Sequence, residues 1–151
     1  MRVYLNTSAL NRPFDDLSVP KVRADAEAIL LVVAELEGRR AALVTSEYLL
    51  FEIGETPDRD RARRVASLLQ LAETVVEASP QVVSRARELE RLGLRGLDAL
   101  HVASAEAGDA QLLITTDDRM LRRARRAGAQ LRTSVVTPVE GLAKLVMERG
   151  E

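Results

Sequence analysis

Oxygen-bearing side chains are the groups in this 151-residue sequence that could act together in a site. The chain has no cysteine and a single histidine, His101. This composition excludes disulfide frameworks, Cys-ligated zinc, Cys nucleophiles and metal sites that need several histidines. A Ser-His-Asp triad could use only His101. The remaining ligands are carboxylates, hydroxyls and amides, which suit hard cations such as Mg²⁺ and Mn²⁺.

Four polar residues follow predicted strands directly or lie in the first turns of the next helix: Asn6, Glu52, Asp98 and Asp117. In an open parallel sheet, ligands bind beyond the carboxyl ends of the strands. Each residue also has an ordinary structural explanation, as a helix cap, a dipole partner or a salt-bridged edge residue. Gathered at one end of a sheet, the acids would repel one another unless a cation compensated. His101 is expected to be a packed or hydrogen-bonded residue and not a metal ligand.

The elements that would position these residues alternate between strand and helix. Short apolar segments predict strands at 2–6, 41–45, 73–76, 111–115 and 134–136. Helical spacing and capping residues predict helices at 21–37, 46–54, 59–71, 80–91, 97–107, 117–127 and 138–147, with a loop at 11–16. Continuously apolar strands are typical of a parallel sheet covered on both faces. We therefore expect an α/β fold with one domain over residues 1–151.

Charge and hydropathy bear on partners and location. The net charge is −1, so no overall positive field attracts nucleic acid, although arginines cluster at 59–64 and at 119–126. These clusters are either solvated helix faces or phosphate contacts. Two Phe, two Tyr and no Trp disfavour a base-stacking platform. The apolar runs are too short to span a membrane and the N-terminus has no signal-peptide layout, so we expect a cytoplasmic protein.

The segments around the four candidates resemble PIN domains, a family that includes the VapC-type toxins of toxin–antitoxin modules. Val3–Leu10 resembles the family's first strand and hydroxyl-bearing loop, and Ser46 and Glu52 match its Ser-x₅-Glu spacing. Leu97–Ala105 is similar to its most recognisable helix. Leu113–Leu121 is similar to its strand, Thr-x-Asp and helix. Four motifs in this order make the resemblance fairly specific, and it covers essentially the full length.

The resemblance implies a three-layer α/β/α sandwich with a central, mostly parallel sheet. It also implies ribonuclease activity on RNA with Mg²⁺ or Mn²⁺. Carried over by position, the acids are Glu52, Asp98 and Asp117, and the supporting hydroxyls are Thr7, Ser8 or Thr115. The family usually has Asp where this chain has Asn6. An amide oxygen can still ligate a hard cation but brings no charge, so we expect weaker metal binding.

Three functions stay open from the sequence. The first is a metal-dependent ribonuclease, with activity reduced by Asn6. The second is a non-catalytic module that has lost its metal and binds RNA or a partner protein. The third is a toxin held inactive by an antitoxin, which requires an exposed apolar groove for the partner. The apolar helix at 21–37 could also support a homodimer.

Overall fold

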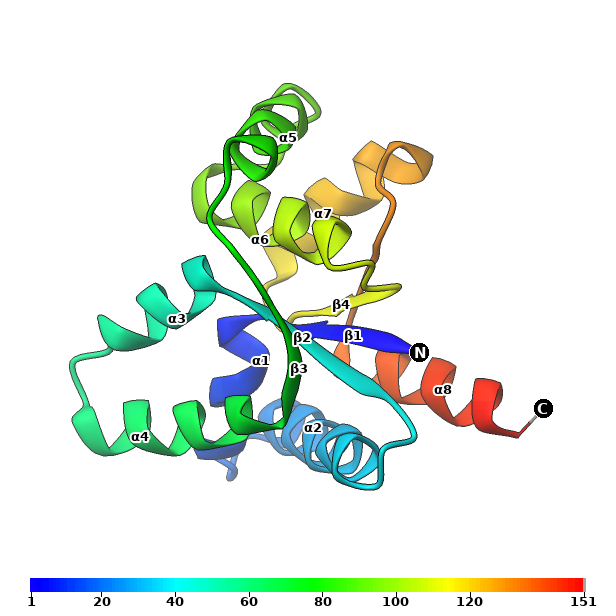
Figure 1. Cartoon of the computed structure of the whole chain (residues 1–151). Coiled ribbons are helices and arrows are strands. Elements are labelled where there is room, and N and C mark those ends of the chain that lie inside the picture. Colours follow the sequence, from blue (N-terminus) through cyan, green and yellow to red (C-terminus); the bar gives the residue numbers. More distant parts are fainter. Residues whose placement is uncertain (151) are drawn as a thin grey trace.

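The computed structural model describes residues 1–150, without the side chain of Arg149, and its centre is a five-stranded parallel sheet (Figure 1). The strands are β1 (Arg2–Leu5), β2 (Ala42–Ser46), β3 (Ala72–Val76), β4 (Leu112–Ile114) and β5 (Ser134–Val136). Their order in the sheet is β3-β2-β1-β4-β5, and every pairing is parallel. The prediction of a parallel sheet is therefore confirmed.

Helices cover both faces of this sheet. The α-helices are α1 (Thr7–Asn11), α2 (Pro20–Glu37), α3 (Glu47–Gly54), α4 (Arg59–Leu68), α5 (Pro80–Arg91), α6 (Gly96–Ala107), α7 (Asp118–Ala127) and α8 (Pro138–Arg149). Short 3₁₀ helices are η1 (Arg12–Phe14), η2 (Leu69–Leu71) and η3 (Gly128–Gln130). In Figure 1, α1, α2 and α8 lie below the sheet and α6 and α7 above it, with α5 packed on α6. This is the three-layer α/β/α sandwich that the resemblance implied.

The three inner strands form the centre of the core. Tyr4, Val44 and Leu113 have no accessible surface, as continuous apolar strands between two helical layers require. Each large apolar side chain buried in this way contributes roughly 1.5–3 kcal/mol through the hydrophobic effect. At the edge of the sheet, β3 alternates half-buried and exposed residues. The core therefore fixes the inner strands, and the candidate site lies beyond the carboxyl ends of these strands.

The strand order reverses between β1 and β4. From β1 the chain builds outward through β2 to β3, then crosses to β4 and builds outward to β5. In doubly wound sheets, ligands bind at such a reversal, in a crevice beyond the carboxyl ends of the two strands. The region beyond the ends of β1 and β4 is called the crevice. The backbone N–H of Asn6 donates to the carbonyl of Ile114 at 2.9 Å. Asn6–Ser8 and Thr115–Asp117 therefore flank the crevice.

The predicted loop at 11–16 was wrong in part. Asn11 ends α1 and residues 12–14 form η1. Helix α1 has five residues, too few to show a helical period. Pro13 suits a first helical turn because its φ is already helical. A salt bridge from Arg61 of α4 to Asp15 at 2.7 Å holds the segment, and such a long-range contact leaves no local sequence signal.

The predicted helix at 59–71 ends at Leu68 and continues as η2. Within residues 1–150, no helix combines the length and apolar character needed to cross a membrane. Leu30 and Leu31 of α2 are each 55% exposed, on the helix that, from the sequence, could support a homodimer. That contact stays a prediction.

Candidate functional site

Asn6 lies at the centre of the crevice, and both ends of its amide are hydrogen-bonded. Its side chain is buried, with 5% of the residue exposed. Oδ1 accepts from the backbone N–H of Thr7 at 2.9 Å and so caps α1. Nδ2 donates to Oγ1 of Thr115 at 3.0 Å and lies 3.4 Å from the sulfur of Met120. The amide therefore ties the end of β1 to the segment after β4.

The hydroxyls beside Asn6 form a second link across the crevice. Thr115 Oγ1 also accepts from the backbone N–H of Asp117 at 3.1 Å and lies 3.1 Å from Ser8 Oγ. Asn6 and Asp117 offer it only N–H donors, so the Thr115 hydroxyl donates to Ser8. Ser8 Oγ in turn accepts from the backbone N–H of Thr116 at 3.1 Å. The hydroxyl groups thus fix the shape of the loops around the site.

Glu52 reaches this crevice from α3. Ser46 begins the helix by accepting from the N–H of Leu49 at 3.1 Å, as predicted. The Glu52 side chain is 29% exposed, and its Oε1 accepts from the Thr7 hydroxyl and contacts His101 Nε2 at 3.1 Å. Burial raises the pKa of Glu52, but the hydrogen bonds from His101 and Thr7 outweigh it and lower the pKa. Within residues 1–150, no group donates a hydrogen bond to Oε2.

His101 is buried and hydrogen-bonded, as expected from the sequence. It is 1% exposed, and its Nδ1 lies 2.7 Å from the hydroxyl of Tyr4. Tyr4 was not among the candidate residues, although it contacts His101, which contacts Glu52. The signal available in the sequence was a single tyrosine between the aliphatic residues Val3 and Leu5, two residues before Asn6.

Asp98 and Asp117 complete the acidic side of the crevice. Asp98 is half-buried in the first turn of α6. Its pKa is raised by burial, then by the negative charge of Asp117 and, to a smaller extent, of Glu52, while His101 and Arg123 oppose the shift. Asp117 caps α7, with Oδ1 accepting from the N–H groups of Arg119 and Met120 at 2.9 and 3.2 Å. The three predicted acids are thus close enough to interact electrostatically.

The oxygen donors suit a hard divalent cation but are not assembled around one point. Within residues 1–150, no group of three or more His, Asp and Glu side chains could hold a metal ion as it stands. Oε1 of Glu52 is turned toward Thr7 and His101, and Oδ1 of Asp117 toward the α7 backbone. The half-buried Asp98 carboxylate receives no hydrogen bond from the described part of the chain. Mutually repelling carboxylates with spare oxygens are chemically suited to Mg²⁺ or Mn²⁺.

The two arginine clusters behave differently. In the cluster at 59–64, Arg61 pairs with Asp15, Arg63 pairs with Asp60, and Arg59 donates to the carbonyl of Gly54. On α7, a small hollow of about 210 Å³ is lined by Arg119, Arg122, Arg123 and Arg126. Its member Arg123 is also near enough to Asp98 to affect that residue's pKa. The basic surface that adjoins the acids therefore comes from α7.

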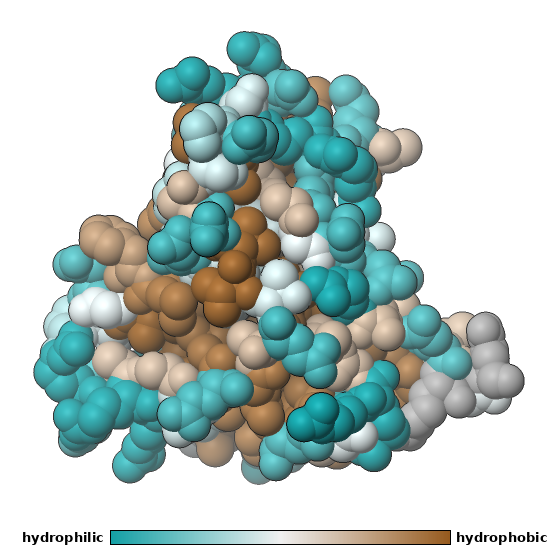
Figure 2. All heavy atoms as spheres, in the orientation of Figure 1, coloured by the Kyte–Doolittle hydropathy of each residue, from teal (hydrophilic) through white to brown (hydrophobic). Residues whose placement is uncertain are grey.

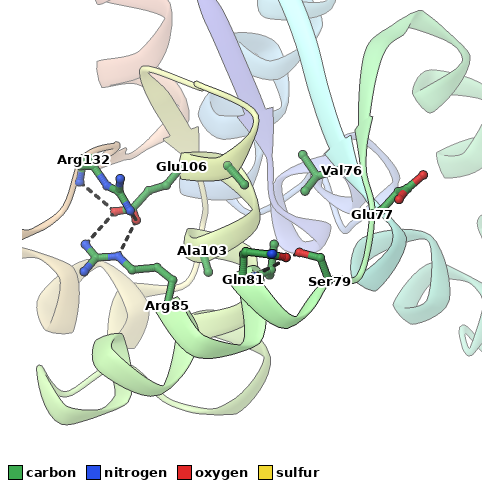
Figure 3. Close-up of a pocket in the computed structure, with 10 residues that line it drawn as sticks. Val76, Glu77, Ser79, Gln81, Arg85, Ala103, Glu106 and Arg132 are labelled. Carbon is green, nitrogen blue, oxygen red and sulfur yellow. Dashed lines mark hydrogen bonds and ion pairs between the residues drawn. The ribbon is translucent and has the colours of Figure 1, made fainter.

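A larger cavity of about 480 Å³ lies elsewhere, where α5, α6 and the end of β3 meet (Figure 3). Glu106, nearly fully buried, points between two arginines there. Arg85 Nε donates to its Oε1 at 2.7 Å, and the backbone N–H of Arg132 donates to Oε2 at 2.8 Å. None of the predicted site residues lines this cavity. Both oxygens of Glu106 are already used, so we assign it to joining α5, α6 and the segment before β5.

The family model of the PIN domain matches residues 3–126. The chain belongs to the PIN domain family. PIN domains are generally nucleases that depend on divalent metal ions. The matched segment contains all four candidate residues of this PIN domain. A search of curated protein sequences found no match.

Solved structures agree with this assignment at the level of the fold. PAE2754 from Pyrobaculum aerophilum aligns with a TM-score of 0.57 and 17% identity, over 97% of this chain and 90% of that one. VapBC2 from Rickettsia felis, solved bound to a DNA fragment from the promoter, aligns with a TM-score of 0.57 and 16% identity, over 91% of this chain and 98% of that one. VapBC-1 from nontypeable Haemophilus influenzae aligns with a TM-score of 0.55 and 16% identity, over 92% of this chain and 99% of that one. The predicted PIN fold is confirmed.

Proposed function

We propose that this PIN domain is a metal-dependent endoribonuclease that hydrolyses RNA phosphodiester bonds, with activity reduced by Asn6. The observation that carries the proposal is the environment of Asp98. Its carboxylate is half-buried, lacks a hydrogen-bond donor within residues 1–150, and has its pKa raised by burial and by Asp117 and Glu52. Such perturbed acids cluster at functional sites because they cost stability that packing alone would not require.

The four candidate residues have different roles in this proposal. Asn6, Glu52, Asp98 and Asp117 would hold Mg²⁺ or Mn²⁺. When bound, such a cation polarises the phosphodiester and lowers the pKa of a coordinated water. Glu52 is kept ionised and turned by Thr7 and His101. Asp98 and Asp117 supply the negative charge, and the Asn6 amide supplies an oxygen without charge.

RNA would approach along α7 in this proposal. The arginines at 119, 122, 123 and 126 line one hollow beside the acids, and guanidinium groups pair well with phosphate oxygens. Because the net charge of the whole chain is −1, this attraction is local. Binding that depends on a few phosphate contacts should weaken steeply with rising salt. A cytoplasmic location, where cellular RNA would be met, is part of the proposal.

The test of the proposed function uses the wild-type protein. We expect it to bind Mn²⁺ in a calorimetric titration and to cleave a mixed pool of RNAs only when Mn²⁺ or Mg²⁺ is present. Cleavage should stop on addition of a chelator. A protein that binds RNA but neither binds Mn²⁺ nor cleaves would instead be the non-catalytic module.

A partner protein is supported by a separate observation. Two of the similar structures are VapBC2 and VapBC-1, and VapBC proteins are complexes of a toxin with its antitoxin. Figure 2 shows apolar side chains gathered over β3 and the start of α3, framed by polar ones. Exposed apolar residues of these elements are Leu50, Phe51 and Val75, at 42%, 67% and 49%. We propose that an antitoxin covers this surface, whose neighbour Glu52 belongs to the candidate site.

Replacing Phe51 with Ser is expected to weaken binding of that antitoxin by about 10-fold or more. Truncating an aromatic side chain that a partner buries commonly costs about 2 kcal/mol of binding free energy. The measurement is the affinity for the purified product of a short reading frame beside the gene. Met147 of α8 is the matched control, since it is 71% exposed and lies on another element. Equal weakening by Phe51→Ser and Met147→Ser would argue against this surface.

A further inference from the structure

A buried chain of hydrogen bonds runs from the start of α3 to Glu52 on the same helix. Ser46 Oγ lies 2.7 Å from the hydroxyl of Tyr4, which lies 2.7 Å from Nδ1 of His101. Nε2 of His101 lies 3.1 Å from Oε1 of Glu52. Ser46, Tyr4 and His101 are each at most 1% exposed, so the links among these three residues are shielded from bulk water. These hydrogen bonds join β1, α3 and α6 behind the candidate site.

The direction of each hydrogen bond in this chain follows from its two ends. Ser46 Oγ accepts from the N–H of Leu49, a group that cannot accept in return. A buried hydroxyl is expected to donate its hydrogen to an acceptor, and within the described residues the acceptor that Ser46 Oγ contacts is Tyr4. Tyr4 must then donate its own hydrogen to Nδ1 of His101. An imidazole that accepts at Nδ1 carries its hydrogen on Nε2, where it donates to Glu52.

We propose that His101 is a positioning residue for Glu52, with its tautomer fixed through Tyr4 by the cap of α3. This inference rests on the proposed function, because the role of Glu52 is to hold a cation. His101 and Thr7 both donate to Oε1, so that oxygen is occupied from two sides. Oε2 is left as the oxygen for the cation. Such supporting hydrogen bonds commonly change metal affinity 10- to 100-fold.

The polarity of the chain can be tested without metal or substrate. His101 is the only histidine, so ¹⁵N-histidine labelling gives the signals of one ring with no assignment problem. We expect the hydrogen on Nε2. Couplings to both ring carbon-bound protons identify Nε2 in the NMR spectrum, and the ¹⁵N chemical shifts of the two nitrogens show which one carries the hydrogen. A hydrogen on Nδ1, in the other tautomer or in a charged ring, would overturn the fixed tautomer. This measurement uses the wild-type protein and does not depend on a variant that folds.

The positioning role is tested with two variants that differ in one donor. His101→Gln retains an N–H that can reach Glu52, whereas His101→Leu has a similar volume and no donor. We expect His101→Leu to weaken Mn²⁺ binding about 10-fold and His101→Gln about 3-fold or less. Thermal unfolding is measured beside the titration, because a purely structural residue would lower the stability of both and leave the affinity of the folded protein unchanged.

The outcomes separate this inference from the proposed function. If the wild-type protein does not bind Mn²⁺, the proposed function fails and takes the positioning role with it. If the wild-type protein binds Mn²⁺ and His101→Leu binds it equally well, the positioning role alone is wrong.

Discussion

Replacing Asn6 with Asp is expected to tighten Mn²⁺ binding about 10- to 100-fold and to increase RNA cleavage in parallel. At an effective dielectric constant near 20, two unit charges 4 Å apart interact by about 4 kcal/mol. Repulsion from the other acids and the burial of position 6 offset part of this. A remainder of about 1.4–2.8 kcal/mol corresponds to the stated range. Calorimetry and cleavage of a labelled RNA measure the two effects.

The surroundings of Asn6 can accept this change. Oδ1 would still cap α1, since Asp and Asn are equally good caps. The Thr115 hydroxyl, which now accepts from Asn6 and donates to Ser8, can turn to donate to a carboxylate if Ser8 donates to Thr115 in return. Without a cation the added buried charge should lower thermal stability, and Mn²⁺ should restore it. Asn11→Asp, the same change at the other end of α1, is the control and should leave metal affinity unaltered.

An Asn6→Asp protein that binds Mn²⁺ no better than wild type would show that position 6 does not face the cation. An inactive wild type and an active variant would instead show a complete site that lacks one charge. The comparison therefore decides between a reduced enzyme and a module that has lost its chemistry.

Replacing Asp98 with Asn is expected to have two effects of opposite sign. Mn²⁺ affinity and RNA cleavage should fall at least about 100-fold, because losing a ligand should exceed the effect of losing a supporting hydrogen bond. In metal-free buffer the variant should instead unfold about 1–3 °C higher than wild type. Burial and the charges of Asp117 and Glu52 penalise the ionised Asp98 carboxylate in the folded state. The amide removes that penalty.

The gain in stability should depend on pH in a defined direction. The pKa of Asp98 is raised above its usual 3.8 in the folded protein, so the unfolded chain loses this proton at lower pH. The penalty on wild type is therefore complete above the folded pKa and disappears as the pH falls below the unfolded value. Thermal melts of both proteins over this range measure the difference.

Asp118→Asn provides the control for this prediction. Asp118 lies beside Asp117 but is exposed at the start of α7. It should lose a small favourable interaction with the helix dipole and retain metal binding. If Asp98→Asn is less stable than wild type without metal, or keeps its Mn²⁺ affinity, Asp98 is a structural acid and the proposed site is wrong.

Much of the fold could be predicted because local patterns agree with it. Apolar runs predicted all five strands, and the caps at Ser46 and Asp117 were found where their helices begin. Helix α1 was missed because five residues are too short for a period to appear. The same limit hid η1, whose position depends on Arg61 from another helix.

The candidate site, like the fold, could be predicted only in part. Spacing identified the four polar residues, because Asn6 and Asp117 directly follow strands and Glu52 and Asp98 lie in the early turns of helices. It could not show that Glu52 is turned toward His101, or that Tyr4 stands behind that histidine. Those contacts join residues that are 49 and 97 positions apart in the chain. Likewise, nothing local indicated that Glu106 would be buried between Arg85 and Arg132.

Two of the candidate ligands also begin helices, and this limits how the site can change. Asn6 starts α1 and Asp117 starts α7, each through a side-chain oxygen. Loss of such an oxygen, as in a change to Ala, would cost about 1 kcal/mol of helix stability as well as a ligand. Asp, Asn, Ser and Thr are therefore the residues that can stand at either position and keep a capping oxygen. An uncharged Asn at position 6 is thus one of the few ways to weaken this chemistry while every helix still starts where it should.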